Sequence, residues 1–458
     1  NMRLIGGNIS DTPVKEIADG SAFSAGGAGS VNPYTIGAFS SVTTISGWDA
    51  HSEADSGTAG LVQVDYCKFD DDDYGFAWRS NADDEVKFGH LTLNASTGAP
   101  TFGAEQDLSG TFTRNTADGT VMIATTESGV CAIAQGHSVG TDAAGIDVGR
   151  FTLSSDSLTL TGSVLLDAVS RTGLSYTQGA AGLIVVSADT VVTTHIDYHG
   201  TAHPGTGSSP HNGINMTPMK ITGTQSVGTT VASTRVFNGG TQRIFKHKDN
   251  GVNFYMPING HLTYWTVSEG STPSIAETTA DIYGAIKQPF YGGTGNGGRA
   301  GRIMNIPEDD NPFSTVFFDT ETANMCFWKA DPGDGNYSVT QDGVDSMVRM
   351  GHPQYGPMLA NKANGALIYI DKVGSVHRFI LVGAHVTTHL TVTPMTVNAT
   401  DGTFSVGPMS FSTNLTPNST HSLWGAVVNS GKTAITIIAQ DDATTVRYVT
   451  VPITDPDA

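Results

Sequence analysis

Few cysteines, few charges and no long apolar segment set the first limits on this chain. Its three cysteines, Cys67, Cys131 and Cys326, are spread over 458 residues. This spacing excludes a small disulfide-stapled fold and a paired-cysteine zinc site. We expect all three to be free thiols buried in strands. Apolar runs stay below the roughly 18 residues of a membrane-spanning helix, so the sequence predicts no insertion into a membrane.

Basic residues are also scarce. The chain has 23 Lys and Arg against 43 Asp and Glu, a formal net charge of −20, and only 14% of its residues are charged. An acidic surface disfavours contact with nucleic-acid phosphates and with anionic membranes. It suits a particle surface that repels its neighbours. We therefore expect neither nucleic acid nor a membrane as a partner.

Glycine and β-branched residues are abundant instead. The 55 glycines lie among frequent Thr, Ser, Val and Ile, a composition typical of short strands joined by tight turns. Strong helix formers such as Glu, Lys, Gln and Arg are sparse. The sequence therefore predicts an all-β fold.

Residues 60–103 contain the clearest structural unit. Short strand-like runs alternate there with polar turns, which predicts an antiparallel β-meander. The expected elements are Leu61–Tyr66, an acidic turn Asp70–Asp73, Gly75–Arg79, Val86–Leu93 and Pro100–Gly103.

Weak copies of this unit fill most of the chain. Gly149–Leu153 matches Gly89–Leu93 position by position, and Gly260–Thr263 repeats the Gly-His-Leu-Thr that begins at Gly89. About seven units recur with a spacing of about 60 residues. Propeller blades are four-stranded, and a ring commonly holds about four to eight of them.

We therefore predict a β-propeller of about seven four-stranded antiparallel sheets over residues 33–458, preceded by an extended N-terminal docking arm at residues 1–32. The last unit is one strand short, and the segment Tyr34–Trp48 stands alone near the start. Pairing of this segment with the last blade would close the ring without an exposed edge. Stacked β-sandwich or β-helix modules remain open, because strand patterns do not fix how sheets pack.

The succession of strand, acidic turn, strand and Gly-x-Leu/Phe-Thr-Leu, seen in Gly60–Gly103 and Gly119–Gly162, resembles the blade-like repeats of bacteriophage tail-fibre and tail-tip proteins. The resemblance covers roughly two thirds of the chain and is one of style and spacing. It implies a virion structural and receptor-binding protein, an adhesin on the particle surface that contacts host surface polysaccharide. It also implies an arm that binds other virion proteins, and a homo-oligomer. A polysaccharide-degrading enzyme on a propeller fold and a purely architectural coat or filament subunit are the alternatives.

Two expected long loops break the repeat, and loops of that length in compact folds are often functional. The first, from His195 to His211, concentrates imidazoles, and the second, Pro289–Pro312, combines Gly with Arg. Receptor contact, metal binding and a plain solvated loop are the readings of the first loop. The residues named as receptor-binding candidates are His195, Asp197, Tyr198, His199, His203, His211, Arg299 and Arg302.

Metal binding has two weak candidates. His195, His199 and His203 recur every four residues, a helical spacing that Gly200 and Pro204 break. Clustered carboxylates such as Asp70 and Asp72 suit calcium, but Tyr74 interrupts the calcium-loop template before Gly75. A solvated hairpin tip is the favoured reading of this acidic turn. We expect no cofactor, with calcium or another metal as the open possibility.

Catalytic motifs are missing. Neither a Gly-x-Ser-x-Gly elbow nor a His-Glu-x-x-His run occurs, so no catalytic residue is assigned and a non-enzyme is expected. A glycosidase needs only two suitably spaced carboxylates, which sequence alone leaves open. Of the aromatics that could stack on sugars, Trp78 and Trp328 occupy equivalent places in their units. This equivalence favours core packing over a glycan site.

Overall fold

The computed structural model describes residues 31–50, 64–80, 82–83, 85–112, 121–138, 143–170, 180–199, 211–237, 245–246, 253–258, 261–279, 303–305, 313–319, 324–330, 347–349, 351–352, 356–357, 365–385, 389–400, 402–412, 415, 423–440 and 444–458. Within these ranges the regular structure consists of strands β1 to β35, without a helix. The all-β prediction is confirmed. Accordingly, the described part of the chain holds no helix long and apolar enough to cross a membrane.

The strands form seven antiparallel sheets of four or five strands, plus the pair β26 (Gly351–His352) and β27 (Gly356–Pro357), in the described residues. We number the seven sheets in chain order. Sheet 1 contains β3 (Val64–Asp70), β4 (Asp73–Arg79), β5 (Val86–Leu93), β6 (Pro100–Phe102) and β7 (Gln106–Asp107). Sheet 2 contains β8 (Val121–Glu127), β9 (Val130–Ser138), β10 (Ala143–Ser154), β11 (Ser157–Leu160) and β12 (Leu165–Ser170). Sheet 3 contains β13 (Ala180–Val185), β14 (Thr190–His199), β15 (His211–Lys220), β16 (Ser226–Val227) and β17 (Val231–Phe237).

The remaining sheets follow the same order of pairing. Sheet 4 contains β18 (Phe245–Lys246), β19 (Asn253–Ile258), β20 (His261–Ser268) and β21 (Ser274–Thr279). Sheet 5 contains β22 (Ile303–Asn305), β23 (Phe313–Asp319), β24 (Asn324–Ala330) and β25 (Met347–Arg349). Sheet 6 contains β28 (Gly365–Val373), β29 (Val376–His385), β30 (His389–Asn398), β31 (Phe404–Val406) and β32 (Ser410–Ser412). Sheet 7 contains β33 (Leu423–Val428), β34 (Ala434–Gln440), β35 (Val446–Thr454), β1 (Thr35–Ile36) and β2 (Thr43–Thr44).

Tight turns keep each strand beside its neighbour in sequence. Asp72, Gly129 and Gly374 have φ values of 64°, 67° and 61° at the first turns of sheets 1, 2 and 6. This left-handed conformation is one that Gly, Asn and Asp adopt most readily, and it closes two-residue hairpins. The predicted acidic turn is therefore confirmed as a hairpin tip between β3 and β4.

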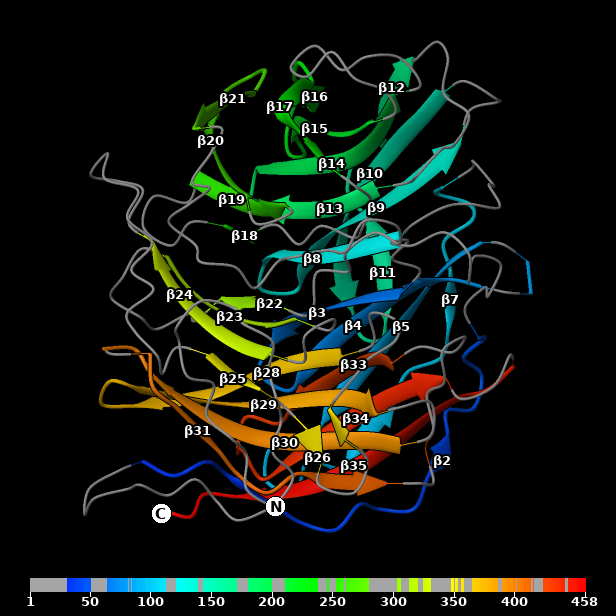
Figure 1. Ribbon diagram of the computed structural model, residues 1–458. Coiled ribbons are helices and arrows are strands. Elements are labelled where there is room, and N and C mark those ends of the chain that lie inside the picture. Colours follow the sequence, from blue (N-terminus) through cyan, green and yellow to red (C-terminus); the bar gives the residue numbers. More distant parts are fainter. Residues whose placement is uncertain are drawn as a thin grey trace.

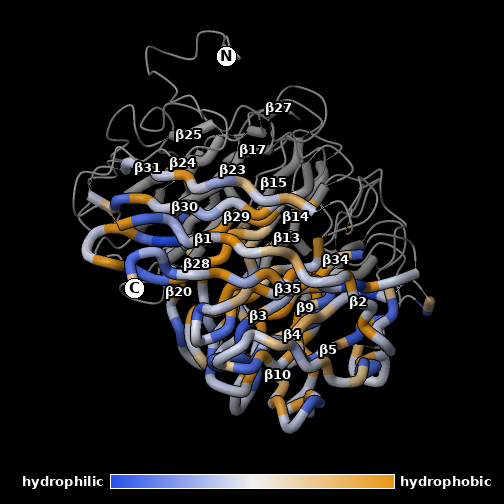
Figure 2. Tube along the Cα trace, turned by 90° about the horizontal axis from the view of Figure 1, so that it is seen from below, coloured by the Kyte–Doolittle hydropathy of each residue, from blue (hydrophilic) through white to orange (hydrophobic). Residues whose placement is uncertain are grey.

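The core lies between consecutive sheets, and the strands β4, β5, β33 and β34 are buried on both faces. On β4, Phe76 and Trp78 pack toward sheet 7, whereas Ala77 between them packs toward sheet 2. Alternation of side chains along a strand explains this division. Further cores lie between sheets 2 and 3, sheets 3 and 4, and sheets 6 and 7. Figure 2 shows the hydrophobic segments along the strands in the middle of the view and the hydrophilic ones at the turns around its edge.

The two ends of the described chain meet in sheet 7. β1 pairs with β35 through Thr35–Thr454 and Ile36–Ile453, and β2 pairs with the same strand further back. First strands also contact each other across sheets, β3 with β8, β8 with β13, β28 with β33, and β33 with β3. Figure 1 shows the sheets following one another around the molecule, with the blue and red ends of the chain side by side.

Polar bridges join the turns of neighbouring sheets at one end of the molecule, which we call the turn end. The Ser128 hydroxyl in sheet 2 donates to Asp70, and the Ser430 amide in sheet 7 donates to Asp72 Oδ1 over 2.6 Å. The acidic tip of sheet 1 is thus held by both of its neighbours. The opposite end of the sheets, reached by the second connection of each, is called the far end.

Two sequence expectations about loops are corrected. The segment expected as a loop from His195 to His211 is in part a strand, because β14 continues to His199 and pairs in unbroken register with β15, which starts at His211. The expected loop Pro289–Pro312 contains β22, which is the first strand of sheet 5 and pairs with β23. Short strands rich in Gly and polar residues gain their stability from pairing, which local composition does not reveal.

Candidate functional site

A cluster of charged side chains lies at the turn of the β28–β29 hairpin, where sheets 6 and 7 meet. Asp371 and Arg378 are cross-strand partners on either side of this turn. The Arg378 side chain is 3% exposed. Its Nε donates to Asp371 Oδ1 over 2.6 Å, and its Nη2 donates to Asp371 Oδ2 over 2.8 Å. This two-pronged geometry matches a planar guanidinium to a carboxylate.

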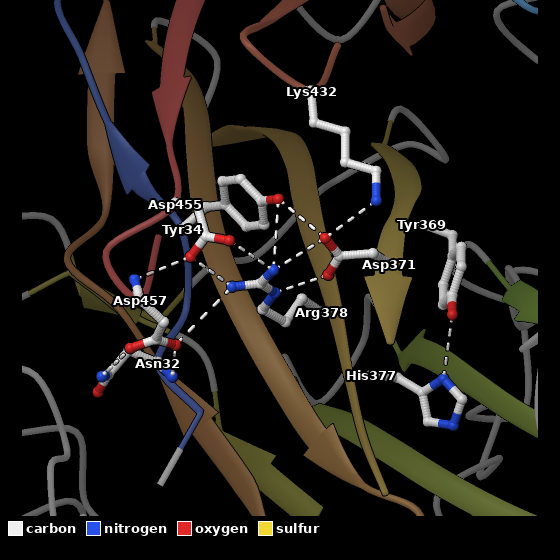
Figure 3. Close-up of polar contacts among 9 residues, drawn as sticks. All are labelled: Asn32, Tyr34, Tyr369, Asp371, His377, Arg378, Lys432, Asp455 and Asp457. Carbon is white, nitrogen blue, oxygen red and sulfur yellow. Dashed lines mark hydrogen bonds and ion pairs between the residues drawn. The ribbon is translucent and has the colours of Figure 1, made fainter. Parts of the chain in front are cut away.

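Two segments from the ends of the chain complete the cluster. Arg378 Nη1 and Nη2 donate to Asp455 Oδ1 and Oδ2 over 2.7 and 2.9 Å, just after β35. On the other side, the guanidinium carbon lies 4.5 Å from the centre of the Tyr34 ring, a cation–π arrangement. The Tyr34 hydroxyl donates to Asp371 Oδ2 over 2.9 Å. Figure 3 shows Arg378 between these three partners.

Asn32 and Asp457 extend the cluster to the entry of the N-terminal segment. The Asn32 backbone amide and its Nδ2 donate to the two carboxylate oxygens of Asp457 over 2.8 and 2.7 Å. Asp457 also lies 3.8 Å from Arg378 Nη1. We call the set of Asn32, Tyr34, Asp371, Arg378, Asp455 and Asp457 the Arg378 clasp. It is joined from sheet 7 by Lys432, whose Nζ lies 3.1 Å from Asp371 Oδ2.

The electrostatics of the clasp favour fixed charges over proton transfer. Burial raises the pKa of Asp371, but hydrogen bonds from Arg378, Tyr34 and Lys432 outweigh burial and hold the pKa below its usual value. The hydrogen bond from Arg378 lowers the pKa of Asp455, and burial raises the pKa of Tyr34 well above its usual value. An acid–base catalyst needs a group that titrates near the working pH. These three shifts run away from neutrality, so the clasp is built to hold chain segments together.

A second buried cation lies in sheet 1. The Lys87 side chain is 5% exposed, and its Nζ lies 2.6 Å from Asp83, 3.4 Å from Asp107 and 3.5 Å from Glu85. Oxygens of these three carboxylates lie within 4.8 Å of one another, close enough to hold a metal ion. The ammonium of Lys87 occupies their midst, and its hydrogen bond to Asp83 and the nearby carboxylates raise its pKa despite the opposing effect of burial. This arrangement is therefore a satisfied ionic cluster. We call Lys87, Asp83, Glu85 and Asp107 the Lys87 cluster.

The predicted histidine-rich segment forms part of sheet 3. His195, Asp197, Tyr198 and His199 lie on β14, and His211 begins β15 as the cross-strand partner of His199. His195 and His199, four positions apart, thus lie on a strand. His203 lies outside the described residues, as do Arg299 and Arg302.

The acidic metal candidates are engaged in the turn bridges. Asp70 and Asp72 accept hydrogen bonds from Ser128 and Ser430 of the neighbouring sheets. Within the described residues, the trio of closely spaced metal-ligand atoms is that of the Lys87 cluster, and it includes neither aspartate. The structure therefore gives both carboxylates a role in linking sheets.

Tryptophans and cysteines follow the core prediction. Trp48, Trp78 and Trp265 are buried, which excludes them as sugar platforms in this fold. Cys67 and Cys131 are free thiols in the core between sheets 1 and 2, with Cys131 fully buried and Cys67 partly so. Burial raises the pKa of the Cys67 thiol to about 12, so it is unreactive at neutral pH. The side chains of Cys326 and Trp328 lie outside the described part of the structure.

The Arg378 clasp escaped the sequence analysis. One signal was available, because Asp371 and Arg378 flank a Gly-containing hairpin turn and so form a cross-strand pair. Nothing in the sequence linked this hairpin to Tyr34 or Asp455, which come from the opposite ends of the chain.

Comparisons with known proteins place this chain in no family. No family model matches it, and none of the curated proteins does. Among solved structures, it is similar at 9% identity and a TM-score of 0.42 to a chain of the mitotic checkpoint complex, covering 98% of each chain. A chain of a yeast (S. cerevisiae) Dbp5 complex with Nup159 and Gle1 gives 11% identity and a TM-score of 0.41, with 92% and 96% covered. The acylaminoacyl peptidase of Pyrococcus horikoshii gives 8% and 0.37, with 85% of this chain and 51% of the peptidase chain covered.

Proposed function

We propose that this chain is a seven-bladed β-propeller that acts as a non-catalytic virion structural and receptor-binding protein. The ring arrangement is supported by the seven consecutive sheets, by the cores between neighbouring sheets and by the contact of β33 with β3. Pairing of β1 and β2 with β35 supports closure by strands from both ends of the chain. A closed ring leaves no sheet edge open for aggregation.

The Arg378 clasp is the observation that carries the attachment role. It fixes Asn32 and Tyr34 to Asp455 and Asp457 and, through Arg378, to sheet 6. Residues 1–32 are the proposed arm that docks on other virion proteins. A pull on this arm would be borne by the clasp and shared between two sheets, which suits a protein that connects a particle to a surface.

The receptor face is proposed at the far end. His199 and His211 are paired there, at the end of sheet 3 opposite its first turn. His195, Asp197 and Tyr198 lead up to this end along β14. Contact with host surface polysaccharide at the far end would leave the turn end, with its sheet-to-sheet bridges and the clasp, free for the particle side. Binding would be weak per site and raised by many copies.

Two variants separate the two roles. Deletion of residues 1–31, which keeps Asn32 and Tyr34 in the clasp, should abolish incorporation into particles and leave polysaccharide binding unchanged. Replacement of His199 and His211 by Ala should reduce polysaccharide binding on a glycan array and leave incorporation intact. Asp71→Asn is the matched control, because this carboxylate is 80% exposed at the turn end.

Three outcomes would contradict the proposal. Incorporation that survives the deletion would refute the docking arm. A glycan array without binding, even for a clustered multivalent form, would refute the adhesin and favour an architectural subunit. Shortening of the polysaccharide during incubation would show an enzyme.

A further inference from the structure

His90 links sheets 1 and 2 through two carboxylates. It lies on β5, and its side chain is 6% exposed. Its Nδ1 lies 2.8 Å from Asp156 Oδ1, in the β10–β11 turn of sheet 2. Its Nε2 lies 3.5 Å from Asp73 Oδ1, at the start of β4 in its own sheet. Each ring nitrogen thus faces a carboxylate, one from each sheet.

A neutral imidazole satisfies only one of these carboxylates, because it carries a single N–H. The short distance assigns that hydrogen to Nδ1, which donates to Asp156. Nε2 then presents a lone pair to the Asp73 oxygen, and it has no hydrogen-bond partner although it is buried. An imidazolium carries hydrogen on both nitrogens, so it donates to both carboxylates.

We propose that His90 is a proton-controlled clasp between sheets 1 and 2. When His90 takes up a proton, Nε2–H donates to Asp73 while Nδ1–H keeps Asp156. This ties the turn of sheet 2 to the β3–β4 hairpin of sheet 1 by two charge-assisted hydrogen bonds. When the proton leaves, the Asp73 contact becomes a repulsion between two acceptors. This proton-dependent contact lies between sheets 1 and 2, and it does not depend on which receptor or particle the protein binds.

The other ionisable groups on the neighbouring strands have partners of their own. On β3, whose Phe69 ring lies against His90, Asp70 accepts a hydrogen bond from Ser128 and Lys68 pairs with Asp71. Of the described strands that lie next to β5, neither β6 nor β11 contains an ionisable side chain. On β7, Asp107 is engaged by Lys87. On β4, Tyr74 donates its hydroxyl to the Val428 carbonyl of sheet 7, and Arg79 lies at the other end of the strand. Asp73 additionally accepts a hydrogen bond from Thr92 over 3.2 Å. Asp73 and Asp156 are thus the charged partners of the ring.

A bound metal ion is a different reading of the same 3.5 Å contact. The proton is favoured, because zinc, the metal that most commonly binds histidine, takes at least three protein ligands. Within the described residues, His90 belongs to no trio of closely spaced ligand atoms. The proton requires no further ligand.

The experiment compares the melting temperatures of the wild type and Asp73→Asn at about pH 5.5 and about pH 8, on either side of the usual histidine range. At the lower pH the imidazolium loses its charged partner, so the variant should melt about 2 °C below the wild type. At the higher pH the Asn amide can donate to the bare Nε2, so the difference should vanish or reverse. Both measurements are repeated in a His90→Gln background, which removes the titration and retains the pH-independent loss of the Thr92 bond.

The proposed role of His90 is supported if the melting-temperature difference caused by Asp73→Asn changes with pH in the wild-type background and stays constant in the His90→Gln background. Equal differences at both pH values in the wild-type background would overturn it. So would a rise in melting temperature with Zn²⁺ that His90→Gln abolishes, because that result would show a metal site. Hydrogen exchange of peptides covering residues 86–93 and 155–160, corrected for intrinsic rates, gives a local readout should Asp73→Asn lower stability throughout. The proposal requires a protection of these peptides at low pH that the variant loses.

Discussion

Arg378 and Lys87 are both buried cations with three carboxylates nearby, but they join very different lengths of chain. The partners of Lys87, at positions 83, 85 and 107, come from one sheet and from within 25 positions of the sequence. The partners of Arg378 come from its own hairpin and from both ends of the described chain. The Lys87 cluster therefore stabilises one sheet, and the Arg378 clasp stabilises the meeting of first and last strands.

The two clusters also differ in their access to water. The carboxylates around Lys87 are 26 to 50% exposed, whereas those around Arg378 are 13% (Asp371), 28% (Asp455) and 30% (Asp457) exposed. Water screens the interactions of exposed charges, and removal of one member of a buried pair leaves the other unsolvated. Loss of Arg378 should therefore cost more than loss of Lys87, and the following predictions test this ranking.

Arg378→Met should have the largest effect. It leaves the carboxylates of Asp371 and Asp455 without their shared partner, which we expect to cost about 3 kcal/mol of unfolding free energy. Chemical denaturation measures the loss, and limited proteolysis at the N-terminal segment should become faster. Arg378→Lys keeps the charge but not the paired hydrogen bonds to two carboxylates, so its unfolding free energy should lie between those of Arg378→Met and the wild type. A Met variant as stable as the wild type would show that the Arg378 clasp does not stabilise the meeting of the first and last strands.

Lys87→Met should have about half that effect. Water can hydrate the three carboxylates once the ammonium is removed. The expected loss of unfolding free energy is therefore about 1.5 kcal/mol, measured in the same denaturation experiment. The N-terminal segment should keep its wild-type resistance to proteolysis, because β1 and β2 pair with β35 of sheet 7 and not with a strand of sheet 1. A loss as large as that of Arg378→Met would show that chain span does not decide the ranking.

Acid should reduce the difference in stability between the wild type and Arg378→Met. The folded-state pKa values of Asp371 and Asp455 lie below the usual 3.8. Their contribution is therefore complete above that value and is lost as the pH falls through the folded-state values. Below about pH 4 the wild type should lose stability more steeply than the variant, as followed by melting temperature. Parallel curves down to pH 2 would contradict the assigned pKa directions.

Calcium should produce the smallest and most discriminating effect. Lys87→Met leaves three carboxylates whose oxygens lie within 4.8 Å of one another, and oxygen clusters of this kind suit calcium. Millimolar calcium should raise the melting temperature of this variant by about 1 °C, and should not change that of Arg378→Met. An equal response of both variants would show a general salt effect.

Much of the fold was predictable because its signals are local. Val86–Leu93 was predicted as a strand and is β5 without change. The acidic turn was predicted as a hairpin tip, and Asp72 adopts the left-handed turn conformation. β14 and β22 were missed in part, because His195–His199 and Ile303–Asn305 carry weak strand signals and are held by pairing with β15 and β23.

The sites were less predictable than the strands. Acidic residues stood out in the sequence as metal candidates, yet Asp70 and Asp72 bridge sheets. His90 was part of a repeated Gly-His-Leu-Thr and was treated only as a strand residue. Its two carboxylates lie 17 positions before it and 66 after it, and no local pattern joins them.

By itself the sequence determined the strands, their turns and the antiparallel sheets, since alternation and turn chemistry act over a few residues. Tertiary structure alone decided which sheet faces which and hence what the charged groups do. Arg378 lies between Tyr34 and Asp455 only because β1 pairs with β35 and sheet 7 packs on sheet 6. Electrostatic contacts form wherever packing brings charges within a few ångströms, and that proximity is a property of the whole folded chain and not of any stretch of it.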